Sequence, residues 1–326
     1  MPSSTTHGNG HSHSYSDIPD TTKSLVPGIY VPTVAFFEDD GDSIDIDTIT
    51  KHAIRLAEAG VAGLVTQGSN GEAVHLDHDE RMLINSTTRK VLDSIHRSDM
   101  PLIVGCGAQS TKETILLCKE ASKSGGSHAL VLSPAYYGSL LTTEMIVQYF
   151  RDVADASPIP LIIYNFPGAC SGLDLSSDTV LSLSQHSNIV GVKFTCGNTG
   201  KVARVASQAK PGFLTMGGSA DLTLQSLVVG GHGVIAGAAN LAPKACIKIM
   251  KLYEAGKVAE ARKVQEVVAR GDWVAIKGGF VSIKCALQIF YGYGGLPRKP
   301  CAIPGKQALE EMRKDFQEMM DLEKSL

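Results

Sequence analysis

The chain has 326 residues, of which 43% are hydrophobic and 19% charged, with a formal net charge of −3. This composition supports a large folded core, and the length suits one large barrel or two ordinary domains. The small negative charge and the lack of a basic stripe argue against nucleic acid as a partner. No uncharged apolar run is long enough to cross a bilayer, so we expect no membrane contact.

The first 24 residues are rich in Ser, Thr, His, Gly and Asp and have no apolar period, which predicts a disordered tail over residues 1–24. The tail lacks the apolar core of a signal peptide, and the first arginine of the chain is Arg55, which disfavours a mitochondrial presequence. The seven cysteines contain no CxxC pair and are odd in number, which indicates reduced thiols. These features predict a cytoplasmic protein. We interpret the tail histidines His7, His11 and His13 as solvated and expect no metal site.

From Gly28 onward, strand-like apolar runs alternate with amphipathic helical stretches. We expect strands at residues 28–36, 61–67, 102–105, 129–133, 161–166, 189–195, 213–217 and 233–237. Helices are expected at residues 46–59, 79–93, 111–124, 143–156, 176–185, 199–209, 222–229 and 243–255. Asp77 and Glu80 have the spacing of a helix-start capping pair.

Eight strand–helix units in this order predict an α/β fold, a (β/α)8 TIM barrel over residues 25–256. A doubly wound open sheet is the alternative, but the acidic turn EDDG at residues 38–41 is unsuited to the phosphate of a nucleotide. Two more helical patterns follow at residues 258–288 and 306–324. No long linker separates them from the barrel, so we expect residues 257–326 to form a small helical appendage packed on it.

Lys193 lies in the apolar run NIVGVKFT of residues 188–195, which is typical of a buried parallel strand. An ammonium group in such a run is costly unless it is paired or neutral. Burial favours the neutral amine, which can attack a carbonyl, so Lys193 is a candidate Schiff-base nucleophile. The alternative is a lysine that extends to the rim of the barrel or pairs with a carboxylate.

Small and polar residues follow several predicted strands. Strand two ends in GSNGE (residues 68–72), whose glycines flank Ser69 and Asn70 and leave backbone N–H groups free to bind a carboxylate. Strands four and five end in SPAYY (133–137) and YNFPG (164–168), and strand eight carries GHGVI (231–235). Active sites of TIM barrels lie at the carboxyl ends of the strands, so these segments should meet Lys193 at one mouth. Each taken alone is also explained by an ordinary turn or a packed tyrosine ring.

Together these motifs resemble the dihydrodipicolinate synthase / N-acetylneuraminate lyase family of pyruvate-dependent class I aldolases. The matching segments are GSNGE, SPAYY, YNFP, GVK (191–193) and GHGVI, in the order of the family, and the resemblance runs from about Pro27 to the C-terminus. It implies a lyase that acts on a small keto acid and an aldehyde. It also implies a homotetramer built as a dimer of dimers.

The resemblance assigns roles to individual residues. Lys193 matches the lysine that forms an imine with C2 of pyruvate, and Tyr164 matches the tyrosine that relays protons. Ser69 and Asn70 match the pair that holds the pyruvate carboxylate. A protonated imine is an electron sink next to C3, so no metal or organic cofactor is expected.

Further positions follow with less support from the motifs. Tyr136 resembles the tyrosine that reaches into the site of a neighbouring subunit, and Ile235 matches a position whose backbone carbonyl contacts the site. Gly218, Ser219 and Ser171 are candidates to contact the polar end of the aldehyde. Polar loop residues are, however, more often solvated than bound to a ligand.

Two departures from the family pattern bear on the substrate. The segment GACSG (168–172) lacks the arginine that binds the carboxylate of aspartate semialdehyde in dihydrodipicolinate synthases, and Phe194 stands where many synthases have glutamate. The SPAYY spacing and segment 291–298 look more like the 4-hydroxy-2-oxoglutarate and 2-keto-3-deoxy sugar acid aldolase branches. We therefore expect reversible cleavage of such an acid to pyruvate and an aldehyde, either glyoxylate or a short hydroxyaldehyde.

Two alternatives remain open. A dihydrodipicolinate synthase that condenses pyruvate with aspartate semialdehyde, or a dehydratase, would share Lys193 and Tyr164 and differ only in the second substrate. A catalytically silent barrel that binds a keto acid is disfavoured, because such a barrel does not need Lys193, Tyr164 and Ser69 together.

Overall fold

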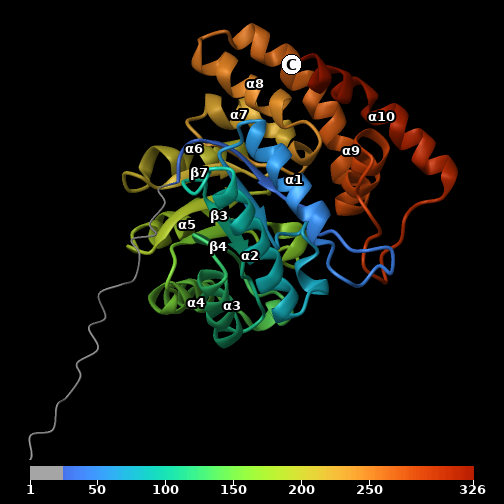
Figure 1. The fold of residues 1–326 in the computed structure, drawn as a ribbon. Helices are drawn as coiled ribbons and strands as arrows, with labels where there is room; N and C mark the ends of the chain where they lie inside the picture. Colours follow the sequence, from blue (N-terminus) through green and yellow to red (C-terminus); the bar gives the residue numbers. More distant parts are fainter. Residues whose placement is uncertain (1–24) are drawn as a thin grey trace, which may run out of the picture.

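The computed structural model describes residues 25–326, and the predicted tail at residues 1–24 lies outside the described residues. Eight parallel strands form a closed barrel in which each strand pairs with the next and β8 pairs with β1 (Figure 1). The predicted (β/α)8 TIM barrel is confirmed. The strands are β1 (Gly28–Pro32), β2 (Gly63–Thr66), β3 (Leu102–Gly105), β4 (His128–Leu132), β5 (Leu161–Asn165), β6 (Ile189–Phe194), β7 (Leu214–Gly217) and β8 (Gly233–Ile235).

Most strands end earlier than the apolar runs predicted. β1 ends at Pro32 instead of residue 36, because proline has no N–H to donate to the ladder. β8 ends at Ile235, and a short 3-10 turn at Gly237–Asn240 follows. The remaining apolar residues belong to the loops at the mouth of the barrel, which places Lys193 one residue from the end of β6.

A ring of amphipathic helices covers the outside of the barrel (Figure 1). Asp77 begins α2 with a complete capping box: its side chain accepts from the Glu80 N–H, and the Glu80 side chain accepts from the Asp77 N–H. The predicted capping pair is therefore confirmed. The ring comprises α1 (Ile46–Glu58), α2 (His78–Ser94), α3 (Thr111–Lys123), α4 (Thr143–Ala156), α5 (Ser177–Ser184), α6 (Thr199–Gln208), α7 (Thr223–Val228) and α8 (Pro243–Glu254).

Two apolar clusters stabilise this arrangement. The larger one fills the space between the sheet and the helices. The smaller one fills the inside of the barrel, as expected for this fold, and includes Tyr30, Ile103, Ile162, Met216 and Ile235. Because side chains fill the barrel interior, the barrel is a packed core and not a pore.

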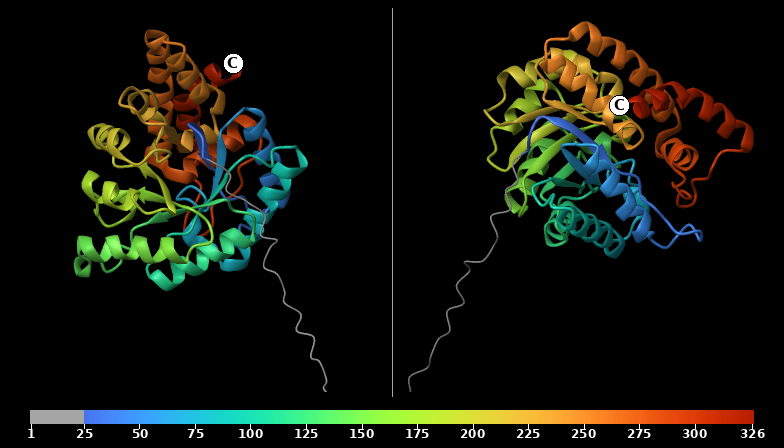
Figure 2. Two further views of the ribbon diagram at one scale, coloured as in Figure 1. Left: turned by 90° about the vertical axis from the view of Figure 1, so that its left-hand side faces the viewer. Right: turned by 45° about the horizontal axis from the view of Figure 1, so that its top comes forward.

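Two C-terminal helices, α9 (Val258–Tyr291) and α10 (Lys306–Ser325), pack on each other and on α8 at one side of the barrel (Figure 2). By length and composition α9 is apolar enough to cross a membrane, a property that core helices of soluble proteins share. Gly279 breaks this helix, with φ 59° and ψ −154°, a conformation open essentially to glycine alone. The break bends α9 where it passes the mouth of the barrel.

Candidate active site

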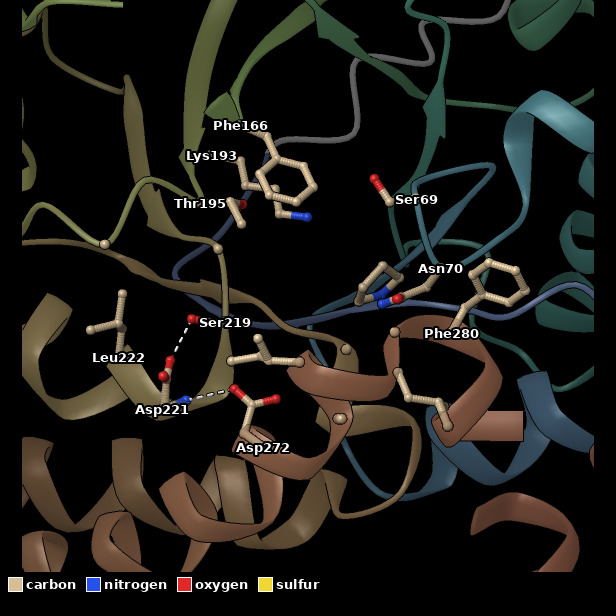
Figure 3. Close-up of a pocket in the computed structure, with 18 of the residues that line it drawn as sticks. Ser69, Asn70, Phe166, Lys193, Thr195, Ser219, Asp221, Leu222, Asp272 and Phe280 are labelled. Atoms are coloured by element: carbon tan, nitrogen blue, oxygen red, sulfur yellow. Dashed lines mark hydrogen bonds between the residues drawn. The ribbon is translucent and has the colours of Figure 1, made fainter. Parts of the chain in front are cut away.

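A cavity of about 500 Å³ lies at the carboxyl ends of the strands (Figure 3). This is the end at which TIM-barrel active sites are found. The loops after β2, β5, β6, β7 and β8 line it, and α9 forms one wall with Asp272, Ala275, Ile276, Gly279, Phe280 and Ile283. In the described part of the chain, no group of three or more His, Cys, Asp or Glu side chains could hold a metal ion.

Lys193 and Tyr164 lie side by side in this cavity. They are register partners on the neighbouring strands β6 and β5, and the Lys193 Nζ atom lies 4.1 Å from the centroid of the Tyr164 ring. Lys193 is only 4% exposed. Its Nζ atom makes no ion pair or hydrogen bond with another described residue, so neither structural alternative, an exposed rim position or a carboxylate pair, is observed.

A tight turn at residues 68–71, which we call the carboxylate turn after its predicted role, faces this amine. The Gly71 N–H donates to the Gly68 carbonyl over 3.0 Å, which places Ser69 and Asn70 at the tip of the turn, where both line the cavity. A Cβ at Gly71 would lie 2.8 Å from the Gln67 nitrogen, so the turn requires glycine there. Figure 3 shows the Lys193 amine and the Ser69 hydroxyl directed into the same space.

The middle of the cavity contains a residue that sequence reasoning missed. Thr195 lines the cavity, and its Oγ1 atom is buried without a hydrogen-bond partner among the described residues. A Cβ at Gly218 would lie 2.0 Å from this Oγ1, so Gly218 leaves room for the hydroxyl. The sequence could have indicated Thr195 as a site residue, because residues two apart on a strand share a face and Thr195 is two residues beyond Lys193.

The far end of the cavity is acidic. Ser219 donates a hydrogen bond to the Asp221 carboxylate, and the Asp221 N–H donates to Asp272 Oδ2 over 2.9 Å. Figure 3 shows these three residues grouped away from Ser69. Burial, and next the negative charge of Asp221, raise the pKa of Asp272 to about 7. Among the lining residues, Lys193 is the single cationic side chain.

Not every predicted residue reaches the cavity. Tyr136 is 79% exposed and packs edge-on against Tyr137, outside the cavity lining. The Ile235 side chain is buried in the barrel interior, so only its backbone remains available to the site. Ser171 does not line the cavity either, whereas Gly218 and Ser219 do.

Comparison with known proteins identifies the family. Residues 25–322 match the dihydrodipicolinate synthetase family. The chain belongs to this family. The predicted resemblance is therefore confirmed.

Two relatives with high identity to this chain are named as aldolases. A probable mitochondrial 4-hydroxy-2-oxoglutarate aldolase from Emericella nidulans is 59% identical over 304 residues, which are 93% of this chain and 98% of that protein. An L-threo-3-deoxy-hexylosonate aldolase from Hypocrea jecorina is 48% identical over 311 residues, 93% of this chain and 99% of that protein. These names agree with the predicted lyase of the aldolase type and give less support to the synthase or silent-barrel alternatives.

Solved structures of the family have the same fold. A dihydrodipicolinate synthase family protein from Coccidioides immitis is 36% identical with a TM-score of 0.84, covering 93% of this chain and 99% of that one. A prophage protein from E. coli K12, described in complex with pyruvate, is 27% identical with a TM-score of 0.83, covering 91% of this chain and 99% of that one.

The predicted cytoplasmic location is wrong. Both the relative from Emericella nidulans and a second one from Coccidioides immitis, 37% identical over 311 residues, are named as mitochondrial, which points to mitochondria rather than to the cytoplasm. The prediction relied on the lack of a signal-peptide core, on the absence of arginine before Arg55 and on unpaired cysteines. Reduced thiols occur in more than one compartment, so these features do not distinguish the two locations.

The raised pKa of Asp272 predicts a pH-dependent stability. Between about pH 4 and pH 7 the folded protein holds a proton at Asp272 that the unfolded chain has lost, so the free energy of unfolding falls as pH rises through this window. Urea unfolding at pH 5 and pH 8 measures how far the free energy of unfolding falls between these two values. In Asp272→Asn this decrease should be smaller than in the wild-type protein by on the order of 2 kcal/mol. The same loss in both proteins would contradict the assignment.

Proposed function

We propose that this member of the dihydrodipicolinate synthetase family is a class I aldolase that cleaves a 2-keto-3-deoxy acid reversibly to pyruvate and an aldehyde. The observation that carries the proposal is the Lys193 amine, buried without a counter-ion beside Tyr164 and opposite the carboxylate turn. A keto acid whose carboxylate binds Ser69 and Asn70 would present its C2 carbonyl to this amine. The aldolase names of the relatives support the same reaction.

The chemistry follows from an amine and a phenol within one cavity. The Lys193 Nζ attacks C2 of the keto acid, and loss of water leaves a protonated imine. The Tyr164 hydroxyl gives its proton to the departing water and is left as a phenolate. The imine then accepts the electron pair of the C3–C4 bond while this phenolate takes the proton from the C4 hydroxyl, which releases the aldehyde and restores the Tyr164 hydroxyl. The enamine then gains a proton at C3, and water hydrolyses the imine to free pyruvate and Lys193. The imine serves as the electrophile, so the proposal includes no metal or organic cofactor.

Dialysis of the protein against EDTA should therefore leave turnover unchanged.

The far end of the cavity favours a neutral, hydroxylated aldehyde over glyoxylate. The Asp221 carboxylate would repel a second carboxylate, and no arginine or further lysine among the lining residues could balance it. Hydroxyl groups, by contrast, can donate to the Asp221 carboxylate and exchange hydrogen bonds with Ser219 and Thr195. These contacts favour a 2-keto-3-deoxy sugar acid, whereas the 59% identity to the Emericella nidulans relative favours 4-hydroxy-2-oxoglutarate as the second candidate.

Borohydride reduction in the presence of pyruvate tests the imine. Intact-mass and peptide analysis should find a pyruvyl adduct on the peptide that contains Lys193, and Lys193→Ala should give none. Tyr164→Phe should still be trapped in part while turnover falls by about 10² to 10⁴, the usual contribution of a general acid–base group. Lys277→Ala, which changes an exposed lysine of α9, serves as the control. An adduct that persists in Lys193→Ala would contradict the assignment.

Steady-state cleavage assays test the choice of aldehyde. We expect a higher kcat/KM for a 2-keto-3-deoxy-hexonate than for 4-hydroxy-2-oxoglutarate. Asp221→Asn should lower this preference by about tenfold, because a hydrogen bond to a charged acceptor contributes ~1.5–3 kcal/mol. Asp321→Asn, on the exposed face of α10, should leave it unchanged. A preference for the dicarboxylate in the wild-type protein would favour the second candidate.

We also propose a homotetramer in which Tyr136 contacts a neighbouring subunit. Tyr136, Tyr137 and Leu140 are 79%, 64% and 71% exposed, an apolar group that a second copy could cover. Light scattering should find an oligomer, and specific activity should fall as the protein is diluted into monomers. In Tyr136→Ala, specific activity should begin to fall at a higher protein concentration than in the wild-type protein. A monomer with full turnover would refute the proposal.

A further inference from the structure

The carboxylate turn is anchored on one side by the barrel. The Gln67 side chain, immediately before the turn, donates to the Arg81 carbonyl over 2.7 Å and to Asn85 Oδ1 over 2.8 Å. Both acceptors belong to α2, which packs against β3 and against the neighbouring helices α1 and α3. This side of the turn therefore depends on contacts within the first half of the barrel.

The other side is anchored by the C-terminal helical region. Glu72 follows the turn directly, and its Oε1 atom lies 3.0 Å from the Nζ atom of Lys284 on α9. Their side chains are 0% and 1% exposed, so water does not screen this ion pair. The same Nζ atom donates to the Leu296 carbonyl over 2.6 Å and lies 4.6 Å from the centroid of the Phe37 ring.

The second carboxylate oxygen of Glu72 is also occupied. Glu72 Oε2 accepts from the Arg298 N–H over 3.0 Å and lies 3.0 Å from His75 Nδ1. Arg298 is fixed in turn by two hydrogen bonds of 2.7 Å to the Glu80 carboxylate. Glu72 itself has φ 50°, a left-handed conformation that is strained for a residue with a Cβ and persists only when its surroundings hold it.

We propose that the Lys284–Glu72 ion pair positions the carboxylate turn, so that the helical region outside the barrel sets the affinity for the keto acid. Neither residue lines the cavity, and neither takes part in the chemistry. They act through Ser69 and Asn70, whose amide N–H groups make no hydrogen bond with another described residue and are free for the substrate carboxylate. The inference rests on the proposed function, because it needs a keto acid carboxylate at this turn.

A positioning role predicts a particular kinetic effect. If the turn moves while Lys193 and Tyr164 keep their places on β6 and β5, the keto acid binds more weakly but the bound molecule still reacts. The concentration of pyruvate that half-saturates imine trapping should therefore rise, with the maximal extent of trapping retained. A merely structural role would instead lower the fraction of active protein without changing this concentration.

The test uses the full-length chain with Glu72→Gln and Lys284→Met combined. Removing both charges leaves no unpaired charge buried, so this double variant should fold better than either single variant. We expect half-saturation at a pyruvate concentration about ten to a hundred times that of the wild-type protein, the fold-change in affinity that loss of one hydrogen bond to a charged group gives. Arg270→Met with Glu318→Gln removes the exposed ion pair between α9 and α10 and should leave half-saturation unchanged.

The outcomes separate this inference from the proposed function. No trapping in the wild-type protein would refute the proposed function. Wild-type half-saturation in a folded double variant would refute the positioning role while leaving the proposed function intact.

If the double variant fails to fold, hydrogen exchange in the wild-type protein tests the positioning role of the ion pair instead. Pyruvate should slow exchange both at residues 68–72 and at the Arg298 N–H, which donates to Glu72. Slowing at residues 68–72 alone would overturn the inference.

Discussion

The amino group of Lys193 is withdrawn from water at the mouth of a closed barrel, and no carboxylate of the described chain is paired with it. A lysine amine that no carboxylate binds is available to attack the carbonyl of a bound keto acid. The rest of the cavity is arranged around that atom. The Tyr164 ring packs beside it, the carboxylate turn faces it, and the acidic residues lie at the opposite end.

This separation of charge divides the cavity into two parts with different preferences. Near Ser69 and Asn70, free backbone N–H groups and the Lys193 amine favour an anion. At the opposite end, the Asp221 carboxylate disfavours an anion. A substrate with one carboxylate and a hydroxylated tail can satisfy both parts in a single orientation. The same division determines which end of the substrate meets Lys193.

The barrel and the centre of the site could be predicted because their signals are local in sequence. Alternating apolar runs gave the strands, and a charge inside one such run marked Lys193. Thr195 was within reach of the same reasoning, since it shares a strand face with Lys193. Asp272 and Lys284 could not be predicted in this way, because they reach their partners only when α9 packs on the barrel. Lys284 and Glu72 are 212 residues apart, and no periodicity connects residues at such a distance.

The break in α9 at Gly279 separates two tasks along one helix. Before the break, Asp272 accepts a hydrogen bond from the Asp221 N–H at the far end of the cavity, whereas Lys284, beyond the break, pairs with Glu72 next to the carboxylate turn. The two halves follow different axes, so a substitution in the first half need not be transmitted to the second. The aldehyde end of the cavity can therefore be altered in the first half of α9 while the second half continues to hold the residue that follows the carboxylate turn.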